Sequence, residues 1–251
     1  MIDFTESQLE RYSRNIIVRE IGGKGQSALL KAKILVIGAG GLGSPLLMYL
    51  AAAGIGTIGI VDDDVVELSN LQRQIIHATP SIGMPKIDSA RDRLGQLNPD
   101  CSIITYNNNL TLENASNIMK NYDIIADGCD NATTRFVVND IAYQLKKPLV
   151  SAAIRGFEGQ LYCFKPYLEG DYPCYRCLYS ENVKETDATC SRSGVLGSIA
   201  GVMGSLQATE IIKEILEVGE SIAQSMIIYQ SLTSNFRNVT LHRDPKCPTC
   251  S

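Results

Sequence analysis

The chain has 251 residues, of which 45% are hydrophobic and 20% are charged, so it can bury a sizeable core in one large domain or two small ones. Its formal net charge of −4 argues against nucleic acid or an anionic membrane as the main partner. Residues 1–20 carry several charged side chains and lack the apolar region of a secretory signal. We therefore expect a cytoplasmic protein with no nucleic-acid or membrane partner.

The first sixty residues predict two short helices over residues 5–31, with a break at 21–23, followed by buried elements. Residues 34–61 carry no charge and are long enough to cross a bilayer, but seven glycines interrupt them. Parallel strands that are covered on both faces are also apolar throughout, which favours a soluble α/β arrangement. The expected elements are a strand (33–37), a glycine turn (38–43), a helix (44–53) and a second strand (57–61).

Helices and strands then alternate to about residue 153, which predicts a parallel, doubly wound α/β sheet. Pro85 opens one of these helices, and Asn98 and Pro99 end it. The expected elements are a loop with a short helix (68–74), a helix (85–97), a strand (102–106), a helix (112–121), a strand (123–126), a helix to residue 146 and a strand (149–153).

The pattern changes after residue 153, and we expect antiparallel strands there. The expected elements are a strand (157–164), an irregular polar stretch (169–193), a long helix (195–216) and two closing strands (226–229 and 236–241). No linker separates the two parts, so we expect a single domain over residues 1–251. It would comprise N-terminal helices (1–32), an α/β core (33–153) and a C-terminal part (154–251).

A glycine-rich turn lies between the first predicted strand and the next helix. It satisfies the pattern G-x-G-x-x-G, in which glycines let the backbone approach a phosphate at a helix N-terminus. Asp62 follows the next strand, where a carboxylate that binds ribose is expected. A purely structural glycine turn is the alternative, and the nucleotide itself is not settled by this pattern. The glycines of the turn are Gly38, Gly40, Gly41 and Gly43.

Polar side chains beyond Asp62 favour a triphosphate over a dinucleotide. Ser69, Asn70 and Arg73 follow the second strand, and Lys86 comes shortly after them. Cations beside the glycine turn would neutralise the extra charge of a triphosphate. Taken alone, the Arg and the Lys are ordinary solvated surface charges, and only their place in the sequence argues for a role.

Asp130 follows the strand at 123–126 and is expected at the carboxyl ends of the strands, where ligands of open α/β sheets lie. A carboxylate there can hold Mg²⁺ against a phosphate. The alternative is that Asp130 or Asn131 only caps the next helix. The residue types leave both interpretations open.

Two C-x-x-C pairs supply four thiolates, which form the closed tetrahedral ligand set of structural zinc. The alternatives are a redox C-x-x-C motif and free thiols. The pairs are Cys174 with Cys177 and Cys247 with Cys250.

Two further residues are candidates for chemistry. Cys190 lies beside Arg192 and shortly before the long helix, which could lower its pKa and make it a nucleophile; an inert loop cysteine is the alternative. Arg14 lies in the N-terminal helix, where a surface salt bridge is the default interpretation.

Taken together, these residues resemble the ThiF/MoeB/HesA family of sulfur-carrier adenylyltransferases, which are relatives of the ubiquitin-activating enzymes. One departure is the segment DGCDN at 127–131, where the family has D-C-T-D-N; the aspartate is retained and the local packing must differ. The matching segments are RYSRN (11–15), GAGGLG (38–43), LSNLQRQ (68–74), PK (85–86), CDN (129–131), CYRC (174–177) and CPTC (247–250).

The resemblance implies a Rossmann-like fold and a role for each matching residue. Gly41 and its neighbours would hold the ATP phosphates, Asp62 the ribose, and Asp130 the Mg²⁺. Phosphate contacts would come from Asn70, Arg73 and Lys86. In a homodimer, Arg14 would reach as an arginine finger into the partner subunit's site. Cys190 would link covalently to the carrier, and residues 154–251 would bind the carrier. The four cysteines of the two C-x-x-C pairs would bind zinc.

The implied reaction is ATP-dependent adenylation of the C-terminal glycine of a ubiquitin-like sulfur carrier, followed by sulfur transfer from a cysteine desulfurase or rhodanese. Thiamine and molybdopterin pathways both remain open, although residues 151–155 and 158–160 look closer to molybdopterin-type members. An NAD-dependent oxidoreductase is the rival, supported by the glycine turn and Asp62. Against it stand Asn70, Arg73 and Lys86 and the lack of a histidine proton relay. A non-catalytic scaffold that binds a partner is a third possibility.

Overall fold

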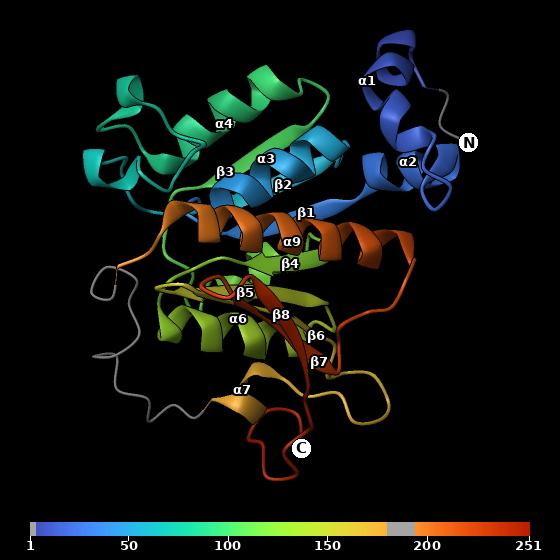
Figure 1. The fold of residues 1–251 in the computed structure, drawn as a ribbon, viewed down its shortest axis with the longest axis vertical. Helices are drawn as coiled ribbons and strands as arrows, with labels where there is room; N and C mark the ends of the chain where they lie inside the picture. Colours follow the sequence, from blue (N-terminus) through green and yellow to red (C-terminus); the bar gives the residue numbers. More distant parts are fainter. Residues whose placement is uncertain (1–3, 180–193) are drawn as a thin grey trace.

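One mixed sheet organises the computed structural model, which describes residues 4–179 and 194–251 (Figure 1). Its strand order is β3-β2-β1-β4-β5-β6-β7-β8. The first five strands in this order are parallel, and β5 to β8 pair antiparallel. The predicted α/β sheet with C-terminal antiparallel strands is therefore confirmed. The strands are β1 (Lys33–Ile37), β2 (Thr57–Val61), β3 (Ser102–Tyr106), β4 (Ile124–Asp127), β5 (Leu149–Arg155), β6 (Glu158–Phe164), β7 (Ser225–Gln230) and β8 (Asn235–Thr240).

Helices cover the two faces of the sheet and enclose a separate apolar core on each (Figure 1). Strand β1 contributes to both cores, because successive side chains of a strand point to opposite faces. Ile34 and Val36 join the core under α3, α4 and α9, whereas Leu35 and Ile37 join the core beside α5 and α6. The helices are α1 (Glu6–Ile16), α2 (Gly22–Lys31), α3 (Gly43–Ala53), α4 (Lys86–Leu97), α5 (Ala115–Met119), α6 (Ala132–Gln144), α7 (Tyr175–Leu178) and α9 (Gly197–Leu216), with short 3₁₀ turns η1 (Leu68–Asn70) and η2 (Thr79–Ser81).

Two predicted helices are shorter in the structure than the sequence pattern suggested. The helix expected over 112–121 is reduced to α5, because the side chain of Asn114 accepts a hydrogen bond from the Thr111 amide at 2.8 Å and holds 111–114 as a turn. The helix expected to reach residue 146 ends at Gln144. Lys146 has φ +53°, a left-handed conformation that cannot continue a right-handed helix.

The start of the long C-terminal helix also differs from the expectation. It begins at Gly197 rather than at residue 195, because Leu196 is extended and Val195 forms a β-bridge with Gly156. The stretch expected to be irregular contains the short helix α7 in its described part. Among the described residues, no helix combines the length and apolar character needed to cross a bilayer.

Candidate functional site

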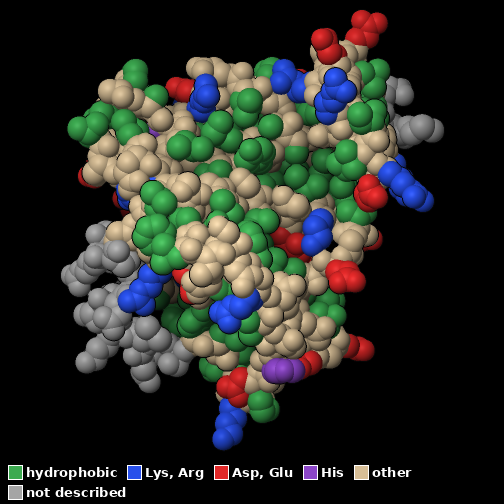
Figure 2. All heavy atoms as spheres, viewed as in Figure 1, with side chains coloured by type: hydrophobic (Ala, Val, Ile, Leu, Met, Phe, Trp, Pro, Cys, Tyr) green, Lys and Arg blue, Asp and Glu red, His purple; other side chains and the backbone are tan. Residues whose placement is uncertain are grey.

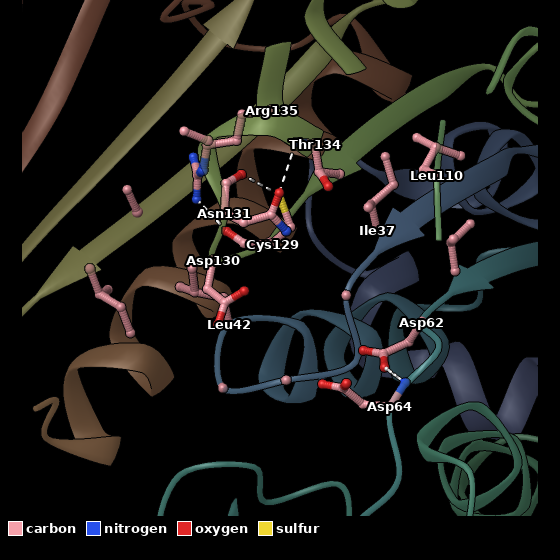
Figure 3. Close-up of a pocket in the computed structure, with 18 of the residues that line it drawn as sticks. Ile37, Leu42, Asp62, Asp64, Leu110, Cys129, Asp130, Asn131, Thr134 and Arg135 are labelled. Atoms are coloured by element: carbon pink, nitrogen blue, oxygen red, sulfur yellow. Dashed lines mark hydrogen bonds between the residues drawn. The ribbon is translucent and has the colours of Figure 1, made fainter. Parts of the chain in front are cut away.

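A cavity of about 690 Å³ opens at the carboxyl ends of the parallel strands (Figure 3). This is the edge at which open α/β sheets bind ligands. Its walls come from the glycine turn after β1, the aspartates after β2 and the 128–132 loop after β4. The C-terminal end of β5 and the first residues of β6 complete them. Gly38, Gly40, Gly41, Asp62, Arg73, Asp130 and Asn131 line it, so these seven candidates converge on one space.

The glycine turn owes its shape to close backbone packing. Gly38 has φ +94°, which is accessible to glycine. A Cβ on Gly43 would lie 2.0 Å from the Gly38 carbonyl oxygen, so the turn cannot close on itself with any other residue there. The turn leads directly into α3, which has no side-chain cap at Leu42, although the Ser44 amide donates to the Gly40 carbonyl oxygen at 2.9 Å. A helix N-terminus of this kind is a ready anion site.

His77 supports the turn from behind. Its Nε2 lies 3.0 Å from the carbonyl oxygen of Ala39, and its Nδ1 lies 2.9 Å from Oγ of Ser89. Burial lowers the pKa of His77, and Lys86 lowers it further. A buried imidazole that is tied to the backbone in this way has a structural role, and it is not placed as a proton relay.

Asp62 stands beside the turn at the end of β2 (Figure 3). Its Oδ2 accepts a hydrogen bond from the Ala39 amide at 2.8 Å, and its Oδ1 accepts one from the Asp64 amide at 3.0 Å. Burial raises the pKa of Asp62, while Lys86 and the two amide hydrogen bonds lower it. Both oxygens keep lone pairs for a ligand hydroxyl.

Arg73 lies against the glycine turn from the other side. Its Nη1 donates to the Ser69 carbonyl oxygen at 3.1 Å, and its aliphatic carbons would lie about 3.5 Å from a Cβ on Gly41. The neighbouring Gln74 is 4% exposed and also lines the cavity, and its Oε1 has no hydrogen-bond partner among the described residues. Sequence reasoning did not single out Gln74, although it belongs to the LSNLQRQ segment.

Three candidates stand one step behind the cavity wall. Lys86 is buried, and its Nζ lies 2.7 Å from Oδ2 of Asp64, which lines the cavity. Asn70 accepts a hydrogen bond from the Glu67 amide at 3.2 Å and so closes η1. Ser69 donates to the Glu67 carboxylate at 3.2 Å. Ser69 and Asn70 therefore hold the segment that presents Arg73. Lys86 does not line the cavity itself but is paired with Asp64, which does.

The loop after β4 assigns helix capping, which the sequence left open between Asp130 and Asn131, to one of these two residues. Asn131 caps α6, because its Oδ1 accepts from the Thr134 amide at 2.8 Å. Asp130 is exposed on the cavity wall, and its carboxylate has no hydrogen bond or ion pair with another described residue. Figure 3 shows Asp130 and Asp62 flanking the glycine turn. Asp130 is thus the carboxylate of this loop that remains available to a ligand.

A buried charge network that sequence reasoning missed holds this loop in place. Arg135 donates to the carbonyl oxygens of Cys129 at 2.6 Å and Ala152 at 2.8 Å and to Oγ of Ser151 at 3.0 Å. Its Nη1 also lies 3.3 Å from Oδ2 of Asp127. The only available signal was a pair of opposite charges, eight residues apart, on either side of the Asp130 loop.

Gln207 reinforces the same place from α9. Its Nε2 donates to the backbone carbonyl oxygens of Asp127 and Val150, both at 2.9 Å. It is fully buried and ties the ends of β4 and β5 to the helix. In the sequence it is one of several polar residues of this helix, and nothing in the pattern places it near the cavity.

The four cysteines of the two C-x-x-C pairs lie close together near the C-terminus. Sγ of Cys174 lies 3.5 Å from that of Cys247, and Sγ of Cys177 lies 3.4 Å from that of Cys250. All four sulfur atoms lie within 4.8 Å of one another. The cluster also braces the cavity, because α7 carries Tyr175, which lines the cavity and whose amide donates to the Asn139 side chain at 2.8 Å.

One described candidate, Arg14, does not line the cavity. Arg14 is exposed on α1 and has no hydrogen bond or ion pair with another described residue. Cys190 lies outside the described residues.

Comparison with known proteins agrees with this geometry. Residues 12–249 match the model of the ThiF family. The chain is 43% identical over 250 residues to the sulfur carrier protein adenylyltransferase of Thermus thermophilus, covering 98% of this chain and 92% of that protein. It is 45% identical over 247 residues to the adenylyltransferase and sulfurtransferase MOCS3 of Culex quinquefasciatus, covering 98% of this chain but 56% of that protein, so it spans about half of that relative.

The fold is also that of a solved nucleotide-binding protein. The crystal structure of E. coli MccB with ATP superposes with a TM-score of 0.82 at 24% identity, over 96% of this chain and 74% of that chain. At this identity the likeness concerns the fold alone. The family match and the two relatives extend over nearly the whole chain, and this chain belongs to the ThiF family.

Proposed function

We propose that this chain uses ATP to adenylate the C-terminal glycine carboxylate of a ubiquitin-like sulfur-carrier protein. The observation that carries the proposal is the convergence of a glycine turn, Asp62, Arg73 and Asp130 around one cavity, where the Asp130 carboxylate has no partner among the described residues. The Thermus relative is an adenylyltransferase that acts on a sulfur carrier protein, which supports the proposal. An NAD-dependent oxidoreductase is disfavoured, because none of the comparisons points to hydride transfer and His77 is committed to the backbone.

The first step needs no nucleophile from the enzyme. An oxygen of the carrier's terminal carboxylate bonds to the α-phosphorus of ATP, the bond from that phosphorus to the bridging oxygen breaks, and pyrophosphate leaves. The glycine turn offers its amides to the phosphates, Arg73 neutralises their charge, and Asp62 accepts a ribose hydroxyl. Lys86 and Asn70 would act from behind the cavity wall: Lys86 places its positive charge beside Asp64, and Asn70 holds the segment that presents Arg73.

The charges of the cavity fit a divalent cation. Its lining carries more carboxylates than guanidinium groups, which would repel a triphosphate without a counter-ion. Mg²⁺ held by Asp130 would supply positive charge beside the phosphates. The carboxylates are Asp62, Asp63, Asp64, Asp130 and Glu158, and the guanidinium groups are Arg73, Arg135 and Arg155.

A test of this function measures isotope exchange. Labelled pyrophosphate should enter ATP only when ATP, Mg²⁺ and a carrier that ends in Gly-Gly are all present; a carrier lacking its last glycine is the control. ATP, but not NAD, should raise the melting temperature, since a ligand at a hundred times its Kd stabilises by about 2.7 kcal/mol. Stabilisation by NAD without pyrophosphate exchange would favour the oxidoreductase instead.

The cysteine cluster fits structural zinc. In a tetrahedral site with zinc–sulfur bonds of about 2.3 Å, neighbouring sulfur atoms lie about 3.8 Å apart. The separations of 3.4, 3.5 and 4.0 Å between cluster sulfurs bracket that value. The zinc would join the residues after β6 to the C-terminus and so hold α7 against the cavity.

We predict one zinc ion per chain, lost in Cys250→Ser together with a fall in melting temperature, since a closed thiolate site contributes folding energy directly. Elemental analysis and thermal denaturation measure the two effects. Cys101→Ser is the control, because Cys101 is buried outside the cluster and should retain the metal. Full zinc content in Cys250→Ser would contradict the assignment.

The position of Arg14 supports a homodimer. Helix α1 packs at the C-terminal end of α3, whereas the glycine turn lies at the N-terminal end, about 16 Å away along an 11-residue helix. That span exceeds the reach of an arginine side chain, so Arg14 would serve the partner subunit's site. Figure 2 shows hydrophobic side chains gathered over α3 and α9. Tyr49 of α3 is also more than half exposed. This face would be buried in the dimer.

The C-terminal part (154–251) is our candidate for carrier binding. Strand β8 is the edge of the sheet and is exposed along most of its length, so it offers unpaired backbone groups. Leu232, in the turn before β8, is 76% exposed, and Phe236, within β8, is 50% exposed, which suits the apolar face of a small partner. A cysteine desulfurase or rhodanese would then deliver sulfur to the carrier, and Cys190 is the candidate for a covalent link to it. The product would serve thiamine or molybdopterin synthesis.

A further inference from the structure

Helix α1 is attached to the core mainly by polar contacts. Tyr12 is its only fully buried residue, so apolar packing alone does not define its orientation. Four of the side chains that make the connection meet the C-terminal end of α3, and we call them the α1 anchor. The α1 anchor consists of Tyr12, Asn15, Gln26 and Asn98.

The α1 anchor satisfies carbonyl groups at the end of α3. Asn98 Nδ2 donates to the Tyr12 hydroxyl at 2.9 Å and to the Ala51 carbonyl oxygen at 2.7 Å. Asn15 Nδ2 donates to Gln26 Oε1 at 3.1 Å and to the Ala53 carbonyl oxygen at 3.3 Å. Gln26 Nε2 donates to the same Ala53 oxygen at 2.9 Å. The last carbonyls of a helix lack intrahelical partners, so these bonds are worth making.

Glycine at position 54 completes the attachment. It adopts φ +88°, and a Cβ there would lie 2.6 Å from Cε1 of Tyr12 and 2.7 Å from Nε2 of Gln26. The Tyr12 ring and the Gln26 amide can therefore sit against the backbone that follows α3. Tyr12 is 1% exposed, and Gln26 and Asn98 are fully buried. The contact is tight enough to fix the direction of α1 and not only its attachment.

The RYSRN segment divides into three residues that attach the helix to the core and two, Ser13 and Arg14, that do not. Arg11 Nη1 donates to the Leu97 carbonyl oxygen at 2.9 Å, and Tyr12 and Asn15 belong to the α1 anchor. Ser13 bonds only within its own helix, to the Glu10 carbonyl oxygen. Arg14 is exposed and has no bond to another described residue.

We propose that the α1 anchor is a positioning device. It fixes the orientation of α1 so that the Arg14 side chain extends into the partner subunit's site and contacts the reacting phosphates there. This rests on the proposed function, in which Arg14 acts across a homodimer. The physical reason is that a displacement of about 1 Å in a group that contacts the reacting atoms can cost up to about a hundredfold in rate. We expect removal of an anchor hydrogen bond to let α1 shift by about that distance.

The test uses mixed dimers of two differently tagged chains. One chain carries Arg14→Ala and keeps Asp130; the other carries Asp130→Ala and keeps Arg14. Only the site of the first chain is complete, and it uses Arg14 of the second. Pyrophosphate exchange by this parent dimer, with a carrier that supports exchange in the unchanged enzyme, tests the proposed function by itself. No mixed dimer, or no exchange in it, would refute the action of Arg14 across subunits.

Asn15→Ala is then placed in either chain. In the chain that donates Arg14, exchange should fall by about tenfold to a hundredfold. In the chain that carries Arg14→Ala, it should stay within about twofold of the parent dimer, because that chain's own α1 does not serve the active site. Equal losses in both placements, or no loss in either, would overturn the positioning role.

A matched control and a milder variant complete the design. Ser13→Ala in the donating chain should leave exchange unchanged, because the Ser13 hydroxyl bonds only within α1. If Asn15→Ala prevents folding, Tyr12→Phe replaces it in the same two placements, since it removes one hydroxyl and keeps the ring against Gly54. The same asymmetry is expected, and its absence there would equally overturn the proposal.

Discussion

Replacing Asp130 with alanine should lower pyrophosphate exchange by about 10²–10³-fold, the usual cost of losing one group that stabilises charge in a transition state. Stability should hardly change, because Asp130 is exposed and Asn131 alone caps α6. Exposed substitutions of this kind usually stay within about 0.5 kcal/mol. Exchange kinetics and thermal denaturation measure the two effects separately.

The control is Asp92→Ala, which removes an exposed carboxylate on α4 outside the cavity. It should leave both exchange and melting temperature as they are. Exchange that survives Asp130→Ala would remove this residue from the mechanism. A large loss of stability in Asp130→Ala would show that the residue has a structural contact instead.

Replacing Arg135 with methionine should destabilise the protein by about 3–5 kcal/mol, because it leaves the buried carboxylate of Asp127 without its cation. For a chain of this size, that corresponds to a fall in melting temperature of roughly 6–20 °C. The Asp130 loop should also lose its place, since Arg135 holds the Cys129 carbonyl oxygen. Exchange is therefore expected to fall in the folded fraction as well.

Two further variants separate charge from shape. Arg155→Met removes an exposed guanidinium at the cavity and should change stability by less than about 0.5 kcal/mol. Adding Asp127→Asn to Arg135→Met should recover part of the lost stability, because no unpaired charge then remains buried. If the double variant is as unstable as Arg135→Met alone, the unpaired charge is not the cause.

The parallel half of the fold could be predicted because its signals are local. An unbroken apolar strand, a glycine turn and a helix recur along the chain, and each depends on residues close together in the sequence. Boundaries were wrong where a single side chain or dihedral overrode the pattern. Asn114 shortened α5, and the left-handed Lys146 stopped α6 before its expected end.

The relation of Lys86 to the cavity depended on a contact between distant segments. Its place after the glycine turn suggested a direct phosphate contact, but the structure pairs it with Asp64, 22 residues earlier. Asp130 and Asn131 are adjacent in sequence and equally able to cap a helix. Only the folded loop assigns the cap to Asn131 and leaves Asp130 facing the cavity.

The sequence by itself determined the glycine turn, the alternation of strands and helices, and the two cysteine pairs. Each of these features depends only on residues that are close together in the sequence. Only the tertiary structure decided which buried groups support the site. Arg135 meets Asp127, Gln207 reaches the ends of two strands, and Asn98 meets Tyr12 across 86 residues. A buried polar group must find a partner wherever the packing supplies one, and packing joins residues with no fixed spacing along the chain.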